Sequence, residues 1–270
     1  MRIPQQIYQR IDNTYYNRAG GTWWQPDSVL HLMETSVNPV RIGYAREKLL
    51  GDLRISPKDK NALEVGCGGG VLAEEIARMG FTTFGIDPSK ESLHAAINHS
   101  LLGGLNISYA AGAGEALPYQ DKFYDVVLCC DVLEHVRDLP KVISEISRVL
   151  KPGGIFFYDT LNRTLISKFV VIKVAQEWKR WAFMPSNIHV WEMFIKPGEL
   201  KLLLAQNNLE WKEHRGIKPG ANLFKILQYL RKRAKGKLTY KDMSNKLPLV
   251  QSNDMSIMYM GYAVKRQQHS

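Results

Sequence analysis

The chain has 270 residues, 45% of them hydrophobic, which is enough to bury a full core, so we expect one domain. The first 21 residues are polar, and the most apolar segment, residues 165–175, contains two lysines. We therefore expect neither a signal peptide nor a helix of the about 20 apolar residues that cross a bilayer. Lysine and arginine outnumber aspartate and glutamate by 36 to 26, a formal net charge of +10, which bears on solubility and steering rather than on fold.

Strand and helix signals alternate from residue 61 onward. Short apolar or β-rich runs predict strands at residues 61–65, 82–87, 107–112, 124–132 and 155–160. Helical spacing of apolar residues predicts helices between them, at residues 71–79, 89–104 and 139–150. Strands that alternate with helices in this way indicate a parallel sheet with helices on both faces.

The pattern changes after Thr160. A long segment with three tryptophans precedes a predicted helix at 196–208, a strand at 209–215, a basic connection and a closing strand within 255–266. No helical crossover leads into the last run, so we expect it to be an antiparallel strand. We predict an α/β fold: a Rossmann-like, mostly parallel seven-stranded sheet with an antiparallel last strand and a helical lid inserted after strand five.

Four glycines lie between Gly66 and Gly70, directly after the first predicted strand. Ligands of such sheets bind outside the carboxyl ends of the strands, and glycines there permit positive φ and close approach of the backbone. The loop lacks the Lys-Ser/Thr pair of a P-loop, and Val71 occupies the last position of the dinucleotide fingerprint. Asp87, which ends the second strand, could accept hydrogen bonds from both ribose hydroxyls. These features predict a nucleoside ligand without a phosphate.

Further motifs follow this loop in a specific order. The segment EVGCGGG at residues 64–70, Asp87, GEALPY at 114–119, YDVVLCCDVLEHV at 124–136 and LKPGG at 150–154 succeed one another along the chain. This series resembles the class I S-adenosylmethionine-dependent methyltransferases. The resemblance implies S-adenosylmethionine as cofactor and S-adenosylhomocysteine as product.

The same resemblance implies roles for individual residues. The glycine loop, with Glu64, Gly66 and Gly68, would pack against the amino acid part of the cofactor. Asp87 would hold the ribose, and the loop that contains Glu115 would cap the adenine.

A closer match lies within that family. TWWQPD at 22–27, NPVRIGYA at 38–45, TLNRT at 160–164 and FIKPGEL at 194–200 make the chain similar to ubiquinone-biosynthesis O-methyltransferases, which methylate polyprenyl phenols and catechols. The match covers roughly residues 15 to 210. It implies that Arg41 reaches the cofactor carboxylate and that Gly66, Asp87 and Cys130 complete the cofactor site.

On this basis the chain is one methyltransferase domain, residues 1–270, in four parts. We expect a helical cap at 1–55, a cofactor-binding core at 56–162 and a lid at 163–198. The C-terminal part of the sheet, with a basic insertion, follows at 199–270.

The sequence DVLEHV offers catalytic groups at the end of the fourth strand. If this segment turns into a helix, Asp131, Glu134 and His135 project to one side, where they could hold Mg²⁺. His135 could instead be the general base, with Glu134 beside it, because an imidazole titrates near neutral pH. A third interpretation is that Glu134 and His135 only cap or pack the helix start. In the resembling family these positions are proposed metal ligands, usually with glutamate where this chain has Asp131.

The lid segment combines aliphatic residues, tryptophans and lysines, a composition suited to an anionic membrane surface. An equally good interpretation is a lid whose apolar face covers the active site. A basic segment follows at 225–241, and a charge run of this kind is most often a solvated helix face. His189, near the lid, is more simply a core histidine than an acceptor contact. Nucleic acid is not expected as a partner, because no accessory RNA-binding module is recognisable.

We therefore predict an S-adenosylmethionine-dependent O-methyltransferase of a phenol or catechol, with a lipid-tailed ubiquinone precursor as one acceptor. Three cysteines, Cys67, Cys129 and the adjacent Cys130, have neither disulfide nor zinc spacing and fit a reducing cytoplasm, with peripheral contact to a membrane. Alternatives are methylation of another small molecule on oxygen or nitrogen, and a non-catalytic assembly subunit. The intact glycine loop and Asp87 argue against the last.

Overall fold

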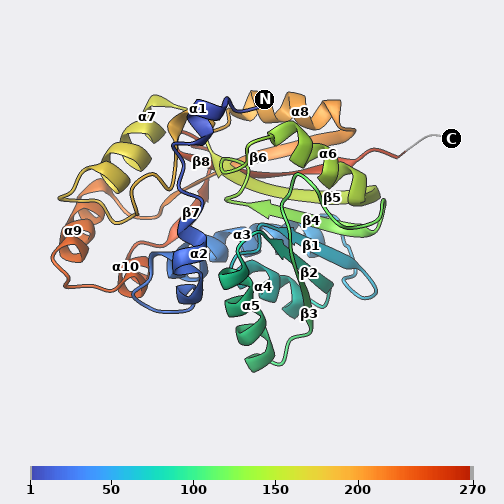
Figure 1. Cartoon of the computed structure of the whole chain (residues 1–270), viewed down its shortest axis with the longest axis horizontal. Helices are drawn as coiled ribbons and strands as arrows, with labels where there is room; N and C mark the ends of the chain where they lie inside the picture. Colours follow the sequence, from blue (N-terminus) through green and yellow to red (C-terminus); the bar gives the residue numbers. More distant parts are fainter. Residues whose placement is uncertain (1, 268–270) are drawn as a thin grey trace.

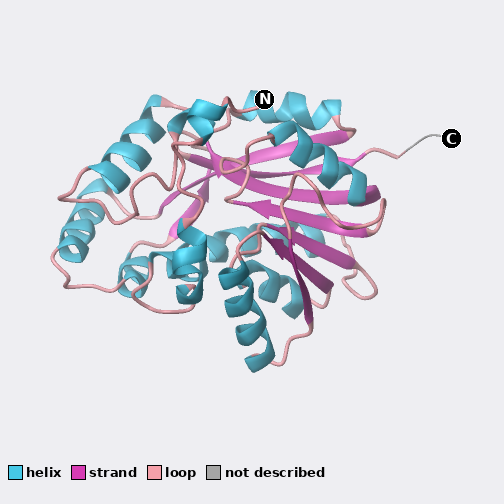
Figure 2. Ribbon diagram, viewed as in Figure 1, coloured by secondary structure: helices cyan, strands magenta, loops and turns pink. Residues whose placement is uncertain are grey.

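The computed structural model describes residues 2–267, and its centre is an eight-stranded sheet in the order β3-β2-β1-β4-β5-β8-β6-β7 (Figures 1 and 2). Neighbours among β1 to β5 are parallel, whereas β8 is antiparallel to β5 and β6, and β7 is antiparallel to β6. The α/β, Rossmann-like fold with an antiparallel last strand is thus confirmed. The strands are β1 (Asn61–Val65), β2 (Thr82–Asp87), β3 (Ile107–Ala111), β4 (Tyr124–Cys130), β5 (Leu150–Leu161), β6 (Leu209–Pro219), β7 (Leu249–Ser252) and β8 (Met258–Lys265).

The sheet has one strand more than the predicted seven. The additional strand is β7, which has only four residues. Residues 209–217 of β6 pair with β8, and residues 216–219 pair with β7 on the opposite edge. A run of four residues is too short to show a period of its own, so pairing with the end of β6 decides its conformation.

Helices cover both faces of the sheet (Figure 2). Phe156 and Phe157 are consecutive in β5 and both are buried, but they belong to different core clusters, one on each face. Residues of α6 and α8 share the cluster of Phe156, and residues of α3 and α4 share that of Phe157. Successive strand residues point to opposite faces, so a strand with two such residues must be covered on both sides. The helices are α1 (Gln5–Tyr8), α2 (Tyr15–Ala19), α3 (Asn38–Arg46), α4 (Val71–Arg78), α5 (Lys90–Leu102), α6 (Leu139–Val149), α7 (Leu165–Ser167), α8 (Pro197–Gln206), α9 (Leu223–Ala234) and α10 (Tyr240–Lys246).

Short 3-10 and π-helical segments extend the N-terminal part and the lid. A π-helix often occurs at a functional site, and η3 and η5 both contribute residues to the cavity described below. The 3-10 segments are η1 (Gly20–Thr22), η2 (Val29–His31) and η6 (Trp191–Met193), and the π-helices are η3 (Met33–Val37), η4 (Glu47–Asp52) and η5 (Lys168–Glu177).

Three regions far apart in sequence meet beside the sheet. The lid helices α7 and η5, the pair α9 and α10, and the N-terminal helices lie together on the left in Figure 1. A satellite core joins them, in which Leu32 packs with Leu230, Met243 and Leu247, and the lid contributes Phe183. The lid is therefore held in place by contacts with the N-terminal part and with the pair α9 and α10. No helix in the described part of the chain is long and apolar enough to span a membrane.

Two leucines of α8 test whether this helix packs on the sheet as described. Leu204 is fully buried, whereas Leu202, half a turn away, is 68% exposed. Leu204→Ala should lower the free energy of unfolding by about 2–5 kcal/mol through lost burial and a residual cavity. Leu202→Ala, with the same change in helix propensity, should alter it by less than about 0.5 kcal/mol. Equal losses in urea denaturation would contradict the placement of α8.

Candidate active site

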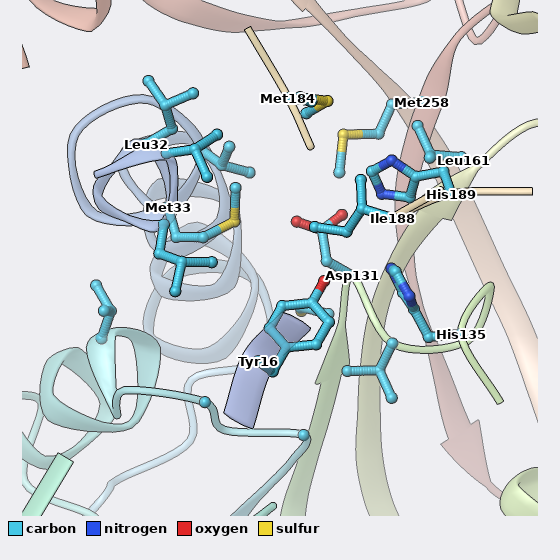
Figure 3. Close-up of a pocket in the computed structure, with 18 of the residues that line it drawn as sticks. Tyr16, Leu32, Met33, Asp131, His135, Leu161, Met184, Ile188, His189 and Met258 are labelled. Carbon is cyan, nitrogen blue, oxygen red and sulfur yellow. The ribbon is translucent and has the colours of Figure 1, made fainter. Parts of the chain in front are cut away.

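A cavity of about 690 Å³ begins at the carboxyl ends of β1, β2 and β4 and extends under the lid. Its inner end is polar, and its outer end is apolar. Figure 3 shows Tyr16, Asp131, His135 and His189 on one side, with Leu32 and Met33 opposite. The predicted site residues among its lining are Arg41, Glu64, Gly66, Gly68, Asp87, Glu115, Cys130, Asp131 and His135.

The glycine loop after β1 is one wall of the inner end. Gly66 and Gly68 have φ angles of 73° and 49°, in the left-handed region that side chains rarely adopt. A Cβ atom on Gly66 would lie 2.2 Å from Val132, and one on Gly68 would lie 2.4 Å from the indole of Trp23. Glycine is therefore required twice over, by backbone conformation and by close packing, and the bare backbone faces the cavity.

Asp87, at the end of β2, ties this loop to the sheet. Its Oδ2 accepts a hydrogen bond from the Gly68 amide and its Oδ1 accepts one from the Ser89 amide, both at 2.8 Å. Burial raises the pKa of Asp87 above its usual value, while the two amides favour the charged form. Each carboxylate oxygen keeps a lone pair for a ligand, because an ionised carboxylate has about four acceptor sites.

Arg41 reaches the same edge of the sheet from α3. Its Nε and Nη2 donate to the two oxygens of Asp159, at 2.5 and 2.7 Å, and it also forms an ion pair with Asp131. Asp159 is fully buried, and burial raises its pKa to about 6 even though Arg41 favours its charged form. Sequence reasoning missed Asp159; the signal was a single carboxylate inside the apolar run IFFYDTL.

Glu64, Cys130 and Glu115 complete the set of residues predicted for the cofactor. Burial raises the pKa of Glu64 to about 8, and its Oε2 has no hydrogen-bond partner in the structure. Burial also raises the pKa of the Cys130 thiol, so the thiol stays protonated. Glu115 is half-buried and accepts a hydrogen bond from the Arg137 amide. All three border the cavity, so the structure brings the predicted cofactor residues to one place.

The structure does not bring Asp131, Glu134 and His135 together as metal ligands. Residues 131–136 form an irregular turn rather than a helix, and α6 begins only at Leu139. Asp131 has a φ of 53° and turns its carboxylate to Arg41, whereas Glu134 accepts a hydrogen bond from Thr160. Among residues 2–267 no group of three His, Cys, Asp or Glu side chains could hold a metal ion. The predicted projection to one side was wrong, because it assumed helical geometry.

Glu134 is also buried as a largely uncharged carboxyl group. Burial and the neighbouring charge of Asp131 raise the pKa of Glu134 to about 8. Its carboxyl group is therefore mostly protonated at neutral pH and contributes little negative charge. These donors do not fit Mg²⁺, and no step of the chemistry below passes through a metal.

His135 lies at the inner end of the cavity as an uncharged base. Burial, with a further contribution from His189, lowers the pKa of His135 to about 3. Tyr16 packs edge-to-face against the His135 ring at 5.8 Å, and the Nε2 of His135 has no hydrogen-bond partner among residues 2–267. His189, expected to be a core residue, is half-buried and lines the cavity, with its ring 5.1 Å from that of His135.

The outer end of the cavity is lined by aliphatic and methionine side chains from the three regions that meet beside the sheet. The basic segment 225–241 contributes Ile226 and Leu230, so α9 is amphipathic rather than a fully solvated helix. Their spacing of four residues was the available signal in the sequence. The main apolar lining residues are Leu32, Met33, Val37, Leu161, Val170, Val171, Val174, Met184, Ile226, Leu230, Met243, Leu247 and Met258.

Comparison with known proteins agrees with this geometry. Residues 41–214 match the model of the methyltransferase domain family. The chain belongs to this family. Ubiquinone biosynthesis O-methyltransferase of Pelagibacter ubique is 36% identical over 207 residues, which are 75% of this chain and 85% of that protein. The enzyme of the same name from Rhizobium etli is 33% identical over 227 residues, 80% and 90% of the two chains.

Solved structures show the same fold. A putative methyltransferase from Bacillus halodurans has a TM-score of 0.58 and 20% identity, over 83% of this chain and 100% of its own. An S-adenosylmethionine-dependent methyltransferase from Aquifex aeolicus has a TM-score of 0.53 and 14% identity, over 98% and 100%. The family match and the relatives at 33–36% identity show that the protein is an S-adenosylmethionine-dependent methyltransferase. Its glycine loop lies at the carboxyl ends of the strands, where sheets of this kind bind ligands.

The ion pair at the centre of the site makes a strong stability prediction. Arg41→Met should lower the free energy of unfolding by about 3–5 kcal/mol, because it leaves the fully buried Asp159 unpaired. Arg41→Met combined with Asp159→Asn should recover part of that loss, since the fully buried charge is removed and only the partly exposed Asp131 still lacks its ion-pair partner. Arg46→Met, an exposed position of α3, is the matched control and should change little. A double variant as unstable as Arg41→Met in urea denaturation would show that the loss comes from packing.

Proposed function

We propose that this methyltransferase transfers the methyl group of S-adenosylmethionine to a hydroxyl of a phenol or catechol that carries an apolar tail. One observation carries the proposal: a single cavity joins the glycine loop and Asp87 to the uncharged His135 and then to a long apolar wall. The names of the relatives, which are ubiquinone biosynthesis O-methyltransferases, support the same acceptor class.

The cofactor would lie at the inner end of the cavity. Gly66 and Gly68 offer bare backbone against its amino acid part, and Asp87 has free acceptor positions for the ribose hydroxyls. The fork of Arg41 is shared with Asp159, and its remaining Nη1 donates to Asn38 and to the sulfur of Met33. A cofactor carboxylate would replace the weak contact of Nη1 with this sulfur. The cofactor supplies an activated sulfonium methyl, which leaves positioning and removal of a proton to the protein.

His135 would accept that proton at Nε2. A base whose conjugate acid has a pKa of about 3 does not ionise a phenol in advance. As the methyl group reaches the phenol oxygen, however, the O–H becomes far more acidic than an imidazolium ion. The proton therefore passes to His135 together with methyl transfer, and the carboxylate of Asp131 nearby stabilises the resulting charge.

The outer end of the cavity would hold the tail. Side chains of η3, η5, α9 and α10 line this end, and a flexible apolar tail on the acceptor would cover them. Burial of each methylene of a tail is worth about 0.8 kcal/mol, so a few prenyl units outweigh the cost of ordering them. Selectivity for a tailed acceptor would therefore come from the apolar side chains at the outer end of the cavity rather than from the residues around His135.

This function is tested by methyl transfer from labelled S-adenosylmethionine to a short-tailed prenyl catechol, with the untailed catechol beside it. We expect transfer to the tailed acceptor with a kcat/KM at least tenfold higher than to the untailed one. Transfer should persist in a chelator, because the carboxylates do not converge on a cation. Intact cofactor binding with no transfer to either acceptor would refute the proposal and favour another small-molecule substrate.

Two substitutions separate cofactor binding from chemistry in the same assay. Asp87→Ala should weaken S-adenosylmethionine binding at least tenfold, because each hydrogen bond to a charged group is worth about 1.5–3 kcal/mol. His135→Ala should keep cofactor affinity in calorimetry and lose most turnover. Retained affinity in the first variant, or unchanged turnover in the second, would mean that the residue is misassigned.

The lid also presents an apolar surface outward. Phe169 of η5 is 57% exposed, the adjoining Trp178 is 52% exposed, and Phe224 of α9 is 76% exposed. Lysines lie on the same two helices: Lys168 and Lys173 on η5, and Lys225 on α9. Exposed aromatic residues beside lysines suit an anionic membrane surface, at about 1 kcal/mol per cation. Since η5 also lines the cavity, such contact would place a lipid-tailed acceptor next to its binding site.

Vesicle co-sedimentation tests this surface. The protein should bind vesicles of anionic phosphatidylglycerol and not neutral phosphatidylcholine, and Phe169→Asp with Phe224→Asp should abolish most of the binding. The matched control is Leu101→Asp with Leu102→Asp, 68% and 88% exposed on α5, away from the lid (Figure 1). If both double variants lose binding equally, the attraction is general charge and the lid has no special part in it.

A further inference from the structure

Two histidines from distant parts of the chain lie next to each other on one side of the cavity (Figure 3). His135 belongs to the turn after β4, and His189 belongs to the lid just before η6. Their ring centroids are 5.1 Å apart and their planes are inclined by 52°. The environment of each ring decides which of its nitrogens carries the proton.

The tautomer of His135 is decided by Asn13. The Nδ2 of Asn13 donates to the backbone carbonyl of His135 at 3.0 Å, which leaves the Oδ1 of the same amide 3.2 Å from the Nδ1 of the ring. A carbonyl oxygen can only accept, so Nδ1 must carry the hydrogen. Nε2 then has a free lone pair, and this atom is buried without a partner.

Gln176 of η5 likewise decides the tautomer of His189. Its Nε2 donates to the His189 carbonyl at 3.2 Å, and its Oε1 accepts from the His189 amide at 2.8 Å. Two backbone groups thus fix which end of this amide is oxygen. That oxygen also lies 3.2 Å from the Nδ1 of the ring, so Nδ1 again carries the hydrogen and Nε2 is left as an acceptor.

We propose that His135 and His189 are a paired acceptor site for two adjacent hydroxyls of a catechol, with Asn13 and Gln176 as the positioning residues that hold both imidazoles as acceptors. The proposal rests on the function proposed above and refines it. Two acceptors on neighbouring rings match two O–H donors on adjacent carbons. A monophenol would satisfy His135 and leave the half-buried His189 without this hydrogen bond, so it would bind more weakly than a catechol.

The two histidines have different parts in the reaction. At the reacting hydroxyl the methyl–sulfur bond breaks, the methyl–oxygen bond forms and the proton moves to Nε2 of His135. The products are the methyl ether, S-adenosylhomocysteine and a protonated His135, which returns its proton to solvent. His189 only accepts a hydrogen bond from the second hydroxyl, so it determines specificity without taking a proton.

Acceptor preference tests the pair. The wild-type protein should show a kcat/KM about tenfold or more higher for a tailed catechol than for the monophenol with the same tail. His189→Phe, which keeps a ring in place, should lower kcat/KM for the catechol much more than for the monophenol, so that the ratio of the two values falls from about tenfold towards one. Equal losses for both acceptors, or no loss for either, would overturn the role of His189.

The positioning role is tested in the free protein by ¹⁵N NMR of the imidazole nitrogens, which needs no turnover. Both histidines should show hydrogen on Nδ1, and Asn13→Ala should change the tautomer signal of His135 alone. Gln176→Ala should likewise change the tautomer signal of His189 alone. Asn98→Ala and Gln206→Ala, both at exposed positions, are the matched controls.

These measurements separate the two proposals. Hydrogen on Nε2 of either histidine in the wild-type protein would overturn the paired acceptor site, even if phenols are methylated. A wild-type protein with both tautomers as expected but no transfer to any phenolic acceptor would refute the proposed function instead. Methylation of catechol and monophenol at equal rates would keep the function and reject the pair.

Discussion

The ion pair between Arg41 and Asp159 is the contact on which the site depends. It joins α3, from the N-terminal part, to the end of β5 at the centre of the sheet. A fully buried carboxylate is tolerated only when a charge and hydrogen bonds compensate its lost hydration, so α3 is held close to the strand ends. With α3 held there, η3 forms one side of the cavity and Asp131 is drawn away from Glu134 and towards the guanidinium.

The cavity is polar at its inner end and apolar at its outer end. Its inner end carries bare backbone, carboxylates and uncharged imidazoles, which suit a charged cofactor and an ionisable hydroxyl. Its outer end consists of aliphatic and methionine side chains from helices that precede and follow the sheet core. Methionine side chains adapt to a flexible chain better than branched ones do, which fits an apolar tail of variable shape.

The sequence predicted well where the signal is local. The alternation of strands and helices, the glycine loop and the position of Asp87 at the end of β2 all follow from short patterns, and the structure agrees with them. The predicted projection of Asp131, Glu134 and His135 to one side was wrong, because it required a helix at residues 131–136 and that segment is a turn. The strand β7 was missed because its pairing with the end of β6 determines its conformation. The apolar face of α9 was missed because its charges were weighed above the spacing of Ile226 and Leu230, and its packing against Leu32 is visible only in the fold.

By itself the sequence determined the class of the fold and the family, because periodicity and motif order are properties of neighbouring residues. It also predicted bare backbone directly after β1, which the structure confirms. Only the tertiary structure decided the directions of the side chains at the strand ends. Asn13 and Gln176 carry no motif, and they matter only because the folded chain sets each amide against a histidine, 122 and 13 residues away. Hydrogen-bond direction depends on geometry, which no spacing of residues encodes.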